Sequence, residues 1–341
     1  MANDLPKKTH PYDNPDSIIS LIKTFKELDW KGKHFKDVLM KYRTMFEIIP
    51  TYPIKVQKGT ILFRGRVNSS TDLIKELKDV GIKPKELVTS FGRANIPNNP
   101  VFYCSSNEET VVGEVTQWYI NENGRFQDLI TKNVINENWH PSTSMLTISA
   151  WLVKEDLNIA LLFNGQIDKR SISIQQHGKD RYDTLLNANK NHLHSKNLLI
   201  DFFSNEFGKT EVKHEFDYIY SAYYAFEVFA NEITDIKAIK FDGIKYTSIA
   251  NENRGENYAI SEYAFKNKVE FLGANYCYAY NNQDKGIIKA GKSIIEKVKS
   301  AILKDNQTFE WIEANDDCNY IVKNGNNYNN LNFKDSIKSR Q

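Results

Sequence analysis

The sequence is poor in cysteine and contains no long apolar run. Its 341 residues include three cysteines, Cys104, Cys277 and Cys318, which are far apart and in no spacing typical of a metal site. This pattern favours reduced thiols over a disulfide framework. No apolar stretch approaches the ~20 residues that a membrane-spanning helix needs. Because the N-terminus is polar and unlike a signal peptide, we predict a cytoplasmic protein with no membrane partner.

The sequence also carries almost no net charge and lacks the common nucleotide-binding motifs. Lys and Arg number 45 against 43 Asp and Glu, a net charge of +2, so composition predicts no nucleic-acid partner. The absence of G-x-G-x-x-G, a Walker loop and G-x-S-x-G weighs against a Rossmann dehydrogenase, a P-loop NTPase and a common serine hydrolase. No H-E-x-x-H or C-x-x-C spacing occurs either, so no metal site is predicted.

What is present is enough apolar material for a substantial core. Hydrophobic residues make up 40% of the chain and aromatic residues 12%, which suits one large domain or two small ones. Apolar spacing predicts helices over 16–49, 71–80, 106–119, 183–206, 215–232 and 293–303. Strands are predicted over 54–63, 97–104, 146–153, 157–163, 238–241, 243–248, 258–260 and 269–280, with 146–153 and 157–163 paired. The low-complexity tail beyond 323 is predicted to be disordered.

Residues 91–103 combine a cation with an aromatic residue. Arg93 lies in a Gly/Pro/Asn-rich loop that also contains Asn95, and Tyr103 follows in a short apolar strand. Loops constrained in this way often hold ligand groups. The structural alternatives are an ordinary turn around Arg93 and a core tyrosine whose hydroxyl is satisfied.

The next candidate site residue along the chain is a carboxylate, Glu114. Glu114 follows Val111 by three residues and precedes Trp118 by four, so it borders the apolar face of a helix that we expect Ser106 to cap. A carboxylate in that position is either the partner of a nearby arginine or a site residue.

Two strand ends complete the candidate set. Arg64, beside Gly65, can bind phosphate through two parallel hydrogen bonds, and Ser248 can bind it through its hydroxyl and amide. For each alone, a solvated strand end is the simpler interpretation. Taken together, arginine, aromatic ring and carboxylate suit an anionic, ring-bearing ligand whose reaction develops positive charge. NAD has these properties.

In chain order these segments resemble the RES domain, named for its arginine, glutamate and serine. The matching segments are Leu62-Phe63-Arg64, Gly92-Arg93-Ala94-Asn95, Val101-Phe102-Tyr103, Glu109-Thr110-Val111-Val112-Gly113-Glu114 and Gly243-Ile244-Lys245-Tyr246-Thr247-Ser248. Ala94 and Thr247 stand where the family has an aromatic residue and a proline. The segment between Glu114 and Ser248 is also longer than in compact members of the family.

The resemblance implies a bacterial toxin that degrades NAD, with ADP-ribosyl transfer to a protein as the alternative. It implies that Arg64 and Arg93 meet the NAD phosphates, that Tyr103 packs near nicotinamide and that Glu114 faces the nicotinamide ribose. Arg64, Glu114 and Ser248 are assigned to catalysis. Asn95 and Tyr246 join Arg93 and Tyr103 as binding residues. NAD is the substrate, and no cofactor or metal is expected.

The implied fold is α+β, with an ADP-ribosyltransferase-like split antiparallel sheet surrounded by helices. We expect an N-terminal helical extension over 1–50 and a catalytic domain over 51–285. A helical insertion at about 164–235 and a C-terminal helix with a disordered tail over 286–341 complete the chain.

The insertion at about 164–235 leads us to predict partners beyond NAD. The polar start of the insertion, with Arg170, His177 and Arg181, suits a lid or a docking surface for a regulator such as an antitoxin. The aromatic helix at 215–232 predicts a homo-oligomer, with a buried core helix as the alternative. A module that senses a nucleotide without turnover is the alternative function of a different class.

Overall fold

The computed structural model describes residues 13–68, 72–123, 141–163, 190–209, 212–248, 255–284, 287–314, 320–324 and 327–331. The chain divides into two compact units. The helical unit comprises Met1–Ile54, Thr89–Pro97 and Asn158–Tyr246. The sheet unit comprises Lys55–Val88, Asn98–Leu157 and Thr247–Gln341. The predicted N-terminal extension and the predicted insertion therefore fall in the same unit.

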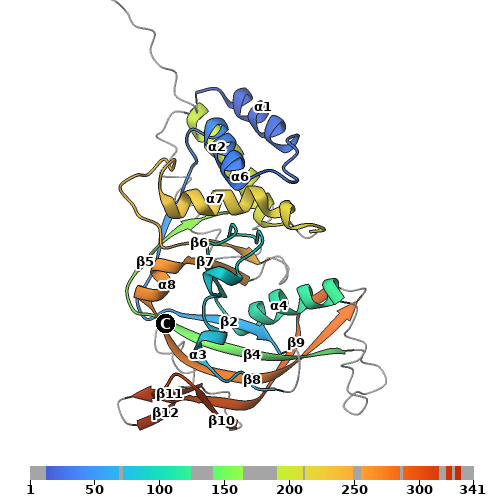
Figure 1. The fold of residues 1–341 in the computed structure, drawn as a ribbon, viewed down its shortest axis with the longest axis vertical. Coiled ribbons are helices and arrows are strands. Elements are labelled where there is room, and N and C mark those ends of the chain that lie inside the picture. The colour runs from blue at the N-terminus through green and yellow to red at the C-terminus, as the bar shows by residue number, and fades with distance from the viewer. Residues whose placement is uncertain are drawn as a thin grey trace, which may run out of the picture. The chain divides into compact units, whose positions relative to one another are not determined.

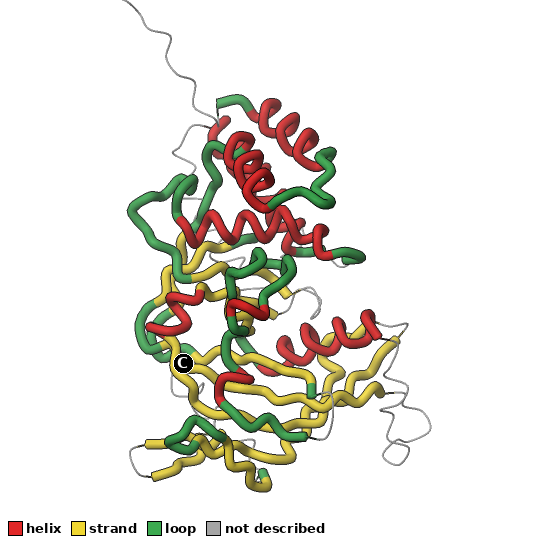
Figure 2. Tube along the Cα trace, viewed as in Figure 1, coloured by secondary structure: helices red, strands yellow, loops and turns green. Residues whose placement is uncertain are grey.

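The helical unit is built mainly from helices (Figures 1 and 2). Its described helices are α1 (Pro15–Lys26), α2 (Phe35–Met45), α6 (Lys190–Phe207), the 3₁₀ turn η4 (Glu215–Tyr218) and α7 (Ile219–Ala230). Strands β1 (Pro53–Val56), β5 (Leu157–Leu161) and β6 (Gly243–Ser248) follow one another in the order β1-β5-β6. Each strand crosses a boundary between the ranges of the two units, so that Ser248, at the end of β6, belongs to the sheet unit. The β5–β6 pair is parallel, with Ile159 opposite Gly243.

Local sequence explains where the first helix begins. The Asn14 side chain accepts a 3.1 Å hydrogen bond from the Asp16 amide, and Pro15 occupies the first helical turn, where its missing N–H costs nothing. The start predicted at Asn14-Pro15 is therefore confirmed. Gly59, with φ of 87°, likewise makes the predicted turn between β1 and β2, a conformation that glycine adopts without steric cost.

The core of the helical unit is aromatic. Phe25 packs edge-on against Phe46 and Trp30, with ring centroids 4.7 and 5.4 Å away. Tyr224 packs against Phe203 at 4.5 Å between ring centroids. Most of α7 is buried, and it ends at Asn231 in the left-handed conformation. Burial within the unit thus accounts for much of the wide apolar stripe of 215–232.

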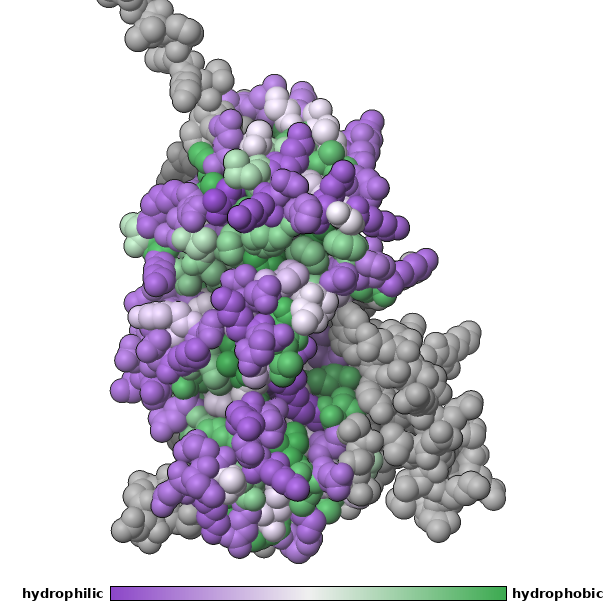
Figure 3. Space-filling model, viewed as in Figure 1, coloured by the Kyte–Doolittle hydropathy of each residue, from purple (hydrophilic) through white to green (hydrophobic). Residues whose placement is uncertain are grey.

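Some hydrophobic surface remains on this helix. In Figure 3, hydrophobic surface gathers in a band over α7. Among the residues of α7, Phe226 and Phe229 are partly exposed. Self-association through this surface stays a prediction, which light scattering at micromolar concentration would check.

The sheet unit contains the longer strands. They are β2 (Ile61–Val67), β3 (Val101–Ser105), β4 (Pro141–Val153), β7 (Gly255–Ser261), β8 (Val269–Asp284), β9 (Ile287–Leu303) and β10 (Phe309–Glu313), in the order β7-β3-β2-β4-β8-β9-β10. Adjacent strands in this order pair antiparallel. Strands β11 (Tyr320–Asn324) and β12 (Asn327–Leu331) form a separate hairpin. The protein is therefore a mixed α and β protein with a mostly antiparallel sheet, as predicted.

Four short or medium helices accompany this sheet. They are α3 (Leu77–Val80), the 3₁₀ turn η1 (Lys85–Leu87), α4 (Glu108–Asn123) and α8 (Glu262–Lys268). Helix α4 packs directly on the sheet because two glycines leave room for it. A Cβ on Gly65 would lie 2.5 Å from Val111 Cγ1, and one on Gly255 would lie 2.0 Å from Thr110 Oγ1. Val111 and the fully buried Val112 join the apolar core beneath α4.

The join between β2 and β3 is narrow. Strand β2 pairs with β4 along its whole length, from Ile61 to Val67, but with β3 only at Phe63 opposite Ser105. The sheet of this unit is thus divided between β7-β3 on one side and β2-β4-β8-β9-β10 on the other, with one described backbone pair between them.

The helix predicted over 71–80 is wrong except for its last turn. Residue 71 lies outside the described part, and residues 72–76 are not helical. The amide of Phe309 donates to Lys75 O at 2.8 Å, and Trp311 Nε1 donates to Ile74 O at 2.7 Å. These long-range bonds occupy carbonyls that a helix would have used, so only Leu77–Val80 is helical before Gly81.

The helix predicted over 293–303 is a strand. These residues belong to β9, which pairs with β8 on one edge and β10 on the other. The apolar spacing of this segment suits a helix equally well, but pairing with two distant strands satisfies its backbone and decides the outcome.

Three further sequence predictions need correction. The strands at 146–153 and 157–163 exist but are not partners, because β4 pairs with β2 and β8 while β5 pairs with β6. Residues 238–241 form a turn and irregular backbone, not a strand. In the tail beyond 323, Asn324 ends β11 and residues 327–331 form β12, whose Tyr328 lies opposite Lys323; residues 325–326 and 332–341 are outside the described part.

Candidate functional site

Helix α4 delivers the candidate carboxylate. The Thr110 amide donates a 2.8 Å hydrogen bond to Asn107 Oδ1, so Asn107 caps this helix and the predicted cap at Ser106 is wrong. The Ser106 amide instead donates to Glu256 O at 3.0 Å, which extends the β3–β7 ladder. Glu114 follows nearly two turns after the cap and is partly buried.

Glu114 lies at the centre of a network of directed hydrogen bonds. Its Oε1 accepts one bond from Ser248 Oγ and another from Asn257 Nδ2, both at 2.6 Å. Asn257 Oδ1 in turn accepts a 2.7 Å bond from Ser105 Oγ. Ser105, Ser248 and Asn257 are all buried. The bonds to Glu114 Oε1 come from donors, which is the arrangement that orients an ionised carboxylate.

The other carboxylate oxygen is positioned differently. Within the described part of the chain, Glu114 Oε2 has no hydrogen-bond partner. Because Oε1 is held at two points, the direction of Oε2 is fixed as well. Such a carboxylate can act on a neighbouring positive charge without first reorganising.

The register of β3 with its two neighbouring strands shows on which face of the sheet this network lies. Ser105 lies opposite Phe63 in β2 and opposite Asn257 in β7, and residues opposite each other project from the same face. Tyr103, two residues before Ser105, projects from this face too. The Tyr103 side chain and the hydrogen-bonded pair of Glu114 and Ser248 therefore lie on the same side of the sheet, the side that α4 covers.

Arg64 projects from the opposite face. It follows Phe63 in β2, and successive side chains of a strand alternate between faces. Its guanidinium carbon lies 5.0 Å from the centroid of the Phe102 ring, which packs edge-on against Trp151 at 5.1 Å. The structure thus places Arg64 in the same unit as Glu114, but on the other side of the sheet.

The Arg64 guanidinium reaches the narrow join between β2 and β3. Its Nη1 donates a 2.8 Å hydrogen bond to Tyr103 O. Since the Ser106 amide bonds to β7, the main-chain groups of Ser105 and Tyr103 point to the β2 side. Tyr103 and Ser105 are two residues apart, about 7 Å along a strand. The Arg64 contact at Tyr103 O and the Ser105 side chain, which belongs to the Glu114 network, are therefore only two residues apart along β3.

Arg64 is nearly fully buried and incompletely bonded. Its side chain is 6% exposed, and its Nε has no hydrogen-bond partner. Burial holds the pKa of Arg64 well below its usual value, and the charge of Arg66 lowers it further. No described carboxylate forms an ion pair with it.

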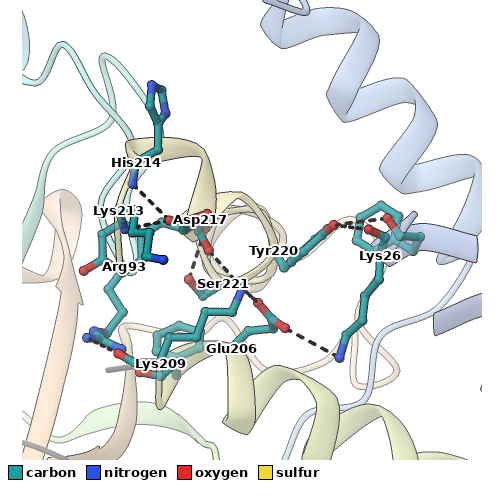
Figure 4. A network of polar contacts seen from close by, with 12 residues as sticks. Lys26, Arg93, Glu206, Lys209, Lys213, His214, Asp217, Tyr220 and Ser221 are labelled. Carbon is teal, nitrogen blue, oxygen red and sulfur yellow. Dashed lines mark hydrogen bonds and ion pairs between the residues drawn. The ribbon is translucent and has the colours of Figure 1, made fainter. Parts of the chain in front are cut away.

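Arg93 has a packing role in the helical unit. It donates from Nη1 to Phe207 O and from Nη2 to Lys209 O at 3.2 Å, and its guanidinium carbon lies 5.4 Å from the Tyr218 ring (Figure 4). A cation is favourable at the end of a helix, where carbonyls lack intrahelical partners. Arg93 therefore fixes its loop to the end of α6.

Asn95 and Tyr246 belong to the same local environment. Asn95 Nδ2 donates to Ser90 O at 3.1 Å, and the Gly92 amide donates to Asn95 O at 2.9 Å, so Asn95 shapes the Arg93 loop. The Tyr246 ring packs 5.0 Å from Phe207, the residue whose carbonyl Arg93 binds. The binding roles of Arg93, Asn95 and Tyr246 stay predictions.

Charged groups next to Arg93 link two helices of this unit. Glu206 is 3% exposed and forms ion pairs with Lys209 and, at 3.9 Å, with Lys26 of α1 (Figure 4). Asp217 accepts bonds from the Lys213 and His214 amides at 2.8 and 3.0 Å. These contacts stabilise the region around the end of α6.

Sequence reasoning missed Asn257, Ser105 and Arg66. Asn257 and Ser105 become visible only once β3 and β7 are known to be paired. Arg66 repeats Arg64 at the strand period of two, a signal that the sequence did contain. The predicted lid residues Arg170, His177 and Arg181 lie outside the described part.

The comparisons with known proteins do not extend this picture. No protein-family model matches the chain, and no curated protein has a significant sequence match to it. In the described segments, no helix is both long and apolar enough to cross a bilayer. No group of three or more His, Cys, Asp or Glu residues in those segments is arranged to bind a metal ion.

Proposed function

We propose that the protein cleaves NAD at the glycosidic bond between nicotinamide and ribose. The observation that carries this proposal is the Glu114 carboxylate, which Ser248 and Asn257 hold by Oε1 while Oε2 has no partner in the described segments. A fixed carboxylate is the group that an oxocarbenium-like ribose needs, because positive charge develops at that sugar as the bond breaks.

Nicotinamide leaves with the bonding electron pair, and positive charge spreads over the ribose carbon and its ring oxygen. Glu114 stabilises that charge and orients the acceptor. Water as acceptor yields ADP-ribose and a proton, and inorganic phosphate yields the 1-phosphate of ADP-ribose. Tyr103, on the same face, is the aromatic residue proposed to pack near nicotinamide.

The narrow join of the sheet supports the proposal at the level of architecture. A sheet divided between β3 and β2, with a cation reaching the join and a carboxylate held nearby, suits a split ADP-ribosyltransferase-like fold of the RES type. In this proposal the NAD phosphates meet Arg64 at the join. The ligand would then contact groups that arise from opposite faces of the sheet.

The decisive experiment is incubation of the purified protein with NAD. We expect free nicotinamide together with ADP-ribose or its 1-phosphate, resolved by chromatography with and without added phosphate. Labelled protein in place of free ADP-ribose would indicate a transferase. Intact NAD would contradict the enzyme proposal and favour a module that senses nucleotides.

A matched pair of variants tests the role of the carboxylate. Glu114→Gln should lower turnover by about 100- to 1,000-fold, the cost of losing one preorganised electrostatic group. Glu109→Gln removes the same charge from an exposed position of the same helix and should retain wild-type turnover. In cells, the wild type should deplete NAD and halt growth, whereas Glu114→Gln should not. Restraint of such an activity by an antitoxin or other regulator is part of the proposal.

A further inference from the structure

A lysine of β9 faces α4 because the strand is bulged. Lys299 lies opposite Tyr276 of β8. Lys297 lies opposite the next residue of β8, Cys277, so Val298 is an extra residue in β9. In a regular strand, residues two apart project from the same face, but one extra residue between them moves them to opposite faces. The bulge therefore turns Lys297 to the face of Cys277, away from the face of Lys299.

The face to which Lys297 turns is the apolar one beneath α4. Cys277 belongs to the same core cluster as Val111 and Val112 of α4. The Lys297 side chain is only 7% exposed, and its Nζ lies 3.0 Å from Oε1 of Glu108, the first residue of α4. Because an ammonium group this far from water needs a nearby counter-charge, the pair holds firmly. It ties the first turn of α4 to β9.

This ion pair and the Glu114 network hold opposite flanks of α4. Glu108 and Glu114 are six residues apart, so their side chains point about 120° apart around the helix axis. Glu108 reaches β9, whereas Glu114 reaches Ser248 at the end of β6 and Asn257 in β7. Val111, which points between these two directions, lies against β2. A rotation of α4 about its axis would therefore break contacts on one flank or the other.

We propose that Lys297 is a positioning residue for Glu114. By pairing with Glu108, it sets the rotation of α4 about its axis and hence the direction of the Glu114 carboxylate. The kinetic consequence rests on the proposed function, whereas the geometry does not. A misplacement of about 1 Å at a reacting centre can cost about 100-fold in rate. Because the carboxylate acts on charge that develops in the transition state, the cost should appear in kcat rather than in KM.

Steady-state cleavage of NAD by the full-length protein tests the kinetic consequence. Lys297→Met keeps the apolar stem but loses the charge, and it should lower kcat by about 10- to 100-fold with KM nearly unchanged. Lys297→Arg keeps the charge and should recover most of kcat. Lys299→Met is the matched control, because it removes an ion pair with Glu313 on the other face of the same strand. It should retain wild-type kcat.

The side-chain amide of Asn257 gives a readout that needs no NAD cleavage. It donates to Glu114 Oε1 at 2.6 Å, so its NMR signals report on the position of the carboxylate. In protein with isotope-labelled asparagine, these signals are identified by their loss in Asn257→Ser. They should shift in Lys297→Met and return towards the wild-type position in Lys297→Arg. Glu108→Gln should also shift them, and Glu109→Gln, at an exposed position next to it, should not.

Two results would overturn the proposal. One is unshifted Asn257 signals in both Lys297→Met and Glu108→Gln, whether or not the protein cleaves NAD. The other is shifted signals with wild-type kcat, because the pair would then have no effect on the reaction. If the wild type leaves NAD intact, the proposed function fails, and the Asn257 signals alone decide whether Lys297 positions Glu114. Should Lys297→Met fail to fold, Glu108→Gln takes its place in both measurements, since Glu108 is the more exposed partner.

Discussion

Ser248 Oγ donates a 2.6 Å hydrogen bond to Glu114 Oε1 across a separation of 134 positions in the sequence. The bond joins the end of β6 to the middle of α4, and Asn257 adds a second donor to the same oxygen. Neither donor carries charge, so among the described residues the carboxylate is oriented by hydrogen bonds and not by an ion pair. That distinguishes it from the paired carboxylate of Glu227, which Arg43 holds in an ion pair at 2.7 Å.

Removing the serine hydroxyl should therefore weaken the proposed catalysis rather than the fold. We expect Ser248→Ala to lower the turnover of NAD by about 10- to 100-fold, the effect of losing one hydrogen bond to a charged group. Ser248→Thr, which keeps the hydroxyl, should retain more activity than Ser248→Ala. Equal activity of Ser248→Ala and wild type, measured as nicotinamide release, would show that this bond does not position Glu114.

Gly255→Ala should disturb the packing of α4 on the sheet. The added Cβ would lie 2.0 Å from Thr110 Oγ1, and Thr110 is fully buried, so the helix has to shift. We expect a loss of about 1–3 kcal/mol in the free energy of unfolding, measured by urea denaturation. Gly81→Ala is the control, because its Cβ would have no neighbour closer than 3.5 Å. Similar losses in both variants would contradict the close approach of α4.

Arg93→Gln should destabilise the helical unit. The variant loses two hydrogen bonds to carbonyls at the end of α6 and the contact with the Tyr218 ring. A loss of about 1–3 kcal/mol in stability is expected. Thermal unfolding without ligand checks this role. If Arg93→Gln unfolds like wild type but binds NAD more weakly, Arg93 is a binding residue, as the sequence resemblance implies, and its packing contacts matter little.

The buried carboxyl of Glu206 gives a prediction about pH. Burial is the largest influence on it and raises its pKa, although Lys209 acts in the opposite direction. A carboxyl with a higher pKa in the folded state favours folding below its unfolded pKa, and this contribution is lost as pH rises through the folded value. Between about pH 4 and pH 7, Glu206→Gln should therefore gain stability relative to wild type. Urea unfolding at both pH values measures the difference, and a change of opposite sign would contradict it.

Features that depend on residues close together along the chain could be predicted from the sequence. Asn14-Pro15 marks the start of α1, and the apolar run at Gly243–Ser248 is a strand with those bounds. Failures occur where distant partners decide. Ile74 and Lys75 bond to the β9–β10 region instead of forming a helix, and β9 itself is a strand because β8 and β10 flank it.

In the candidate site too, some residues could be predicted from local sequence and others depend on pairing between distant segments. Glu114 and Ser248 could be singled out from short motifs, and the structure brings them into contact. Asn257 could not, since its role depends on the pairing of β7 with β3. The position of Arg64 on the face opposite Glu114 depends on strand register, which motif order does not contain.

The single backbone pair between β2 and β3 has a consequence for the mechanics of the sheet. Strand β2 is tied to β4 by seven residue positions but to β3 by one, with the Arg64 side chain bridging to Tyr103 O beside it. Amide hydrogens along this seam lack the protection of a continuous ladder, so hydrogen exchange should be faster there than between β2 and β4. The Arg64 side chain thus supplies, through Tyr103 O, a link between two strands whose backbones are paired at one described position.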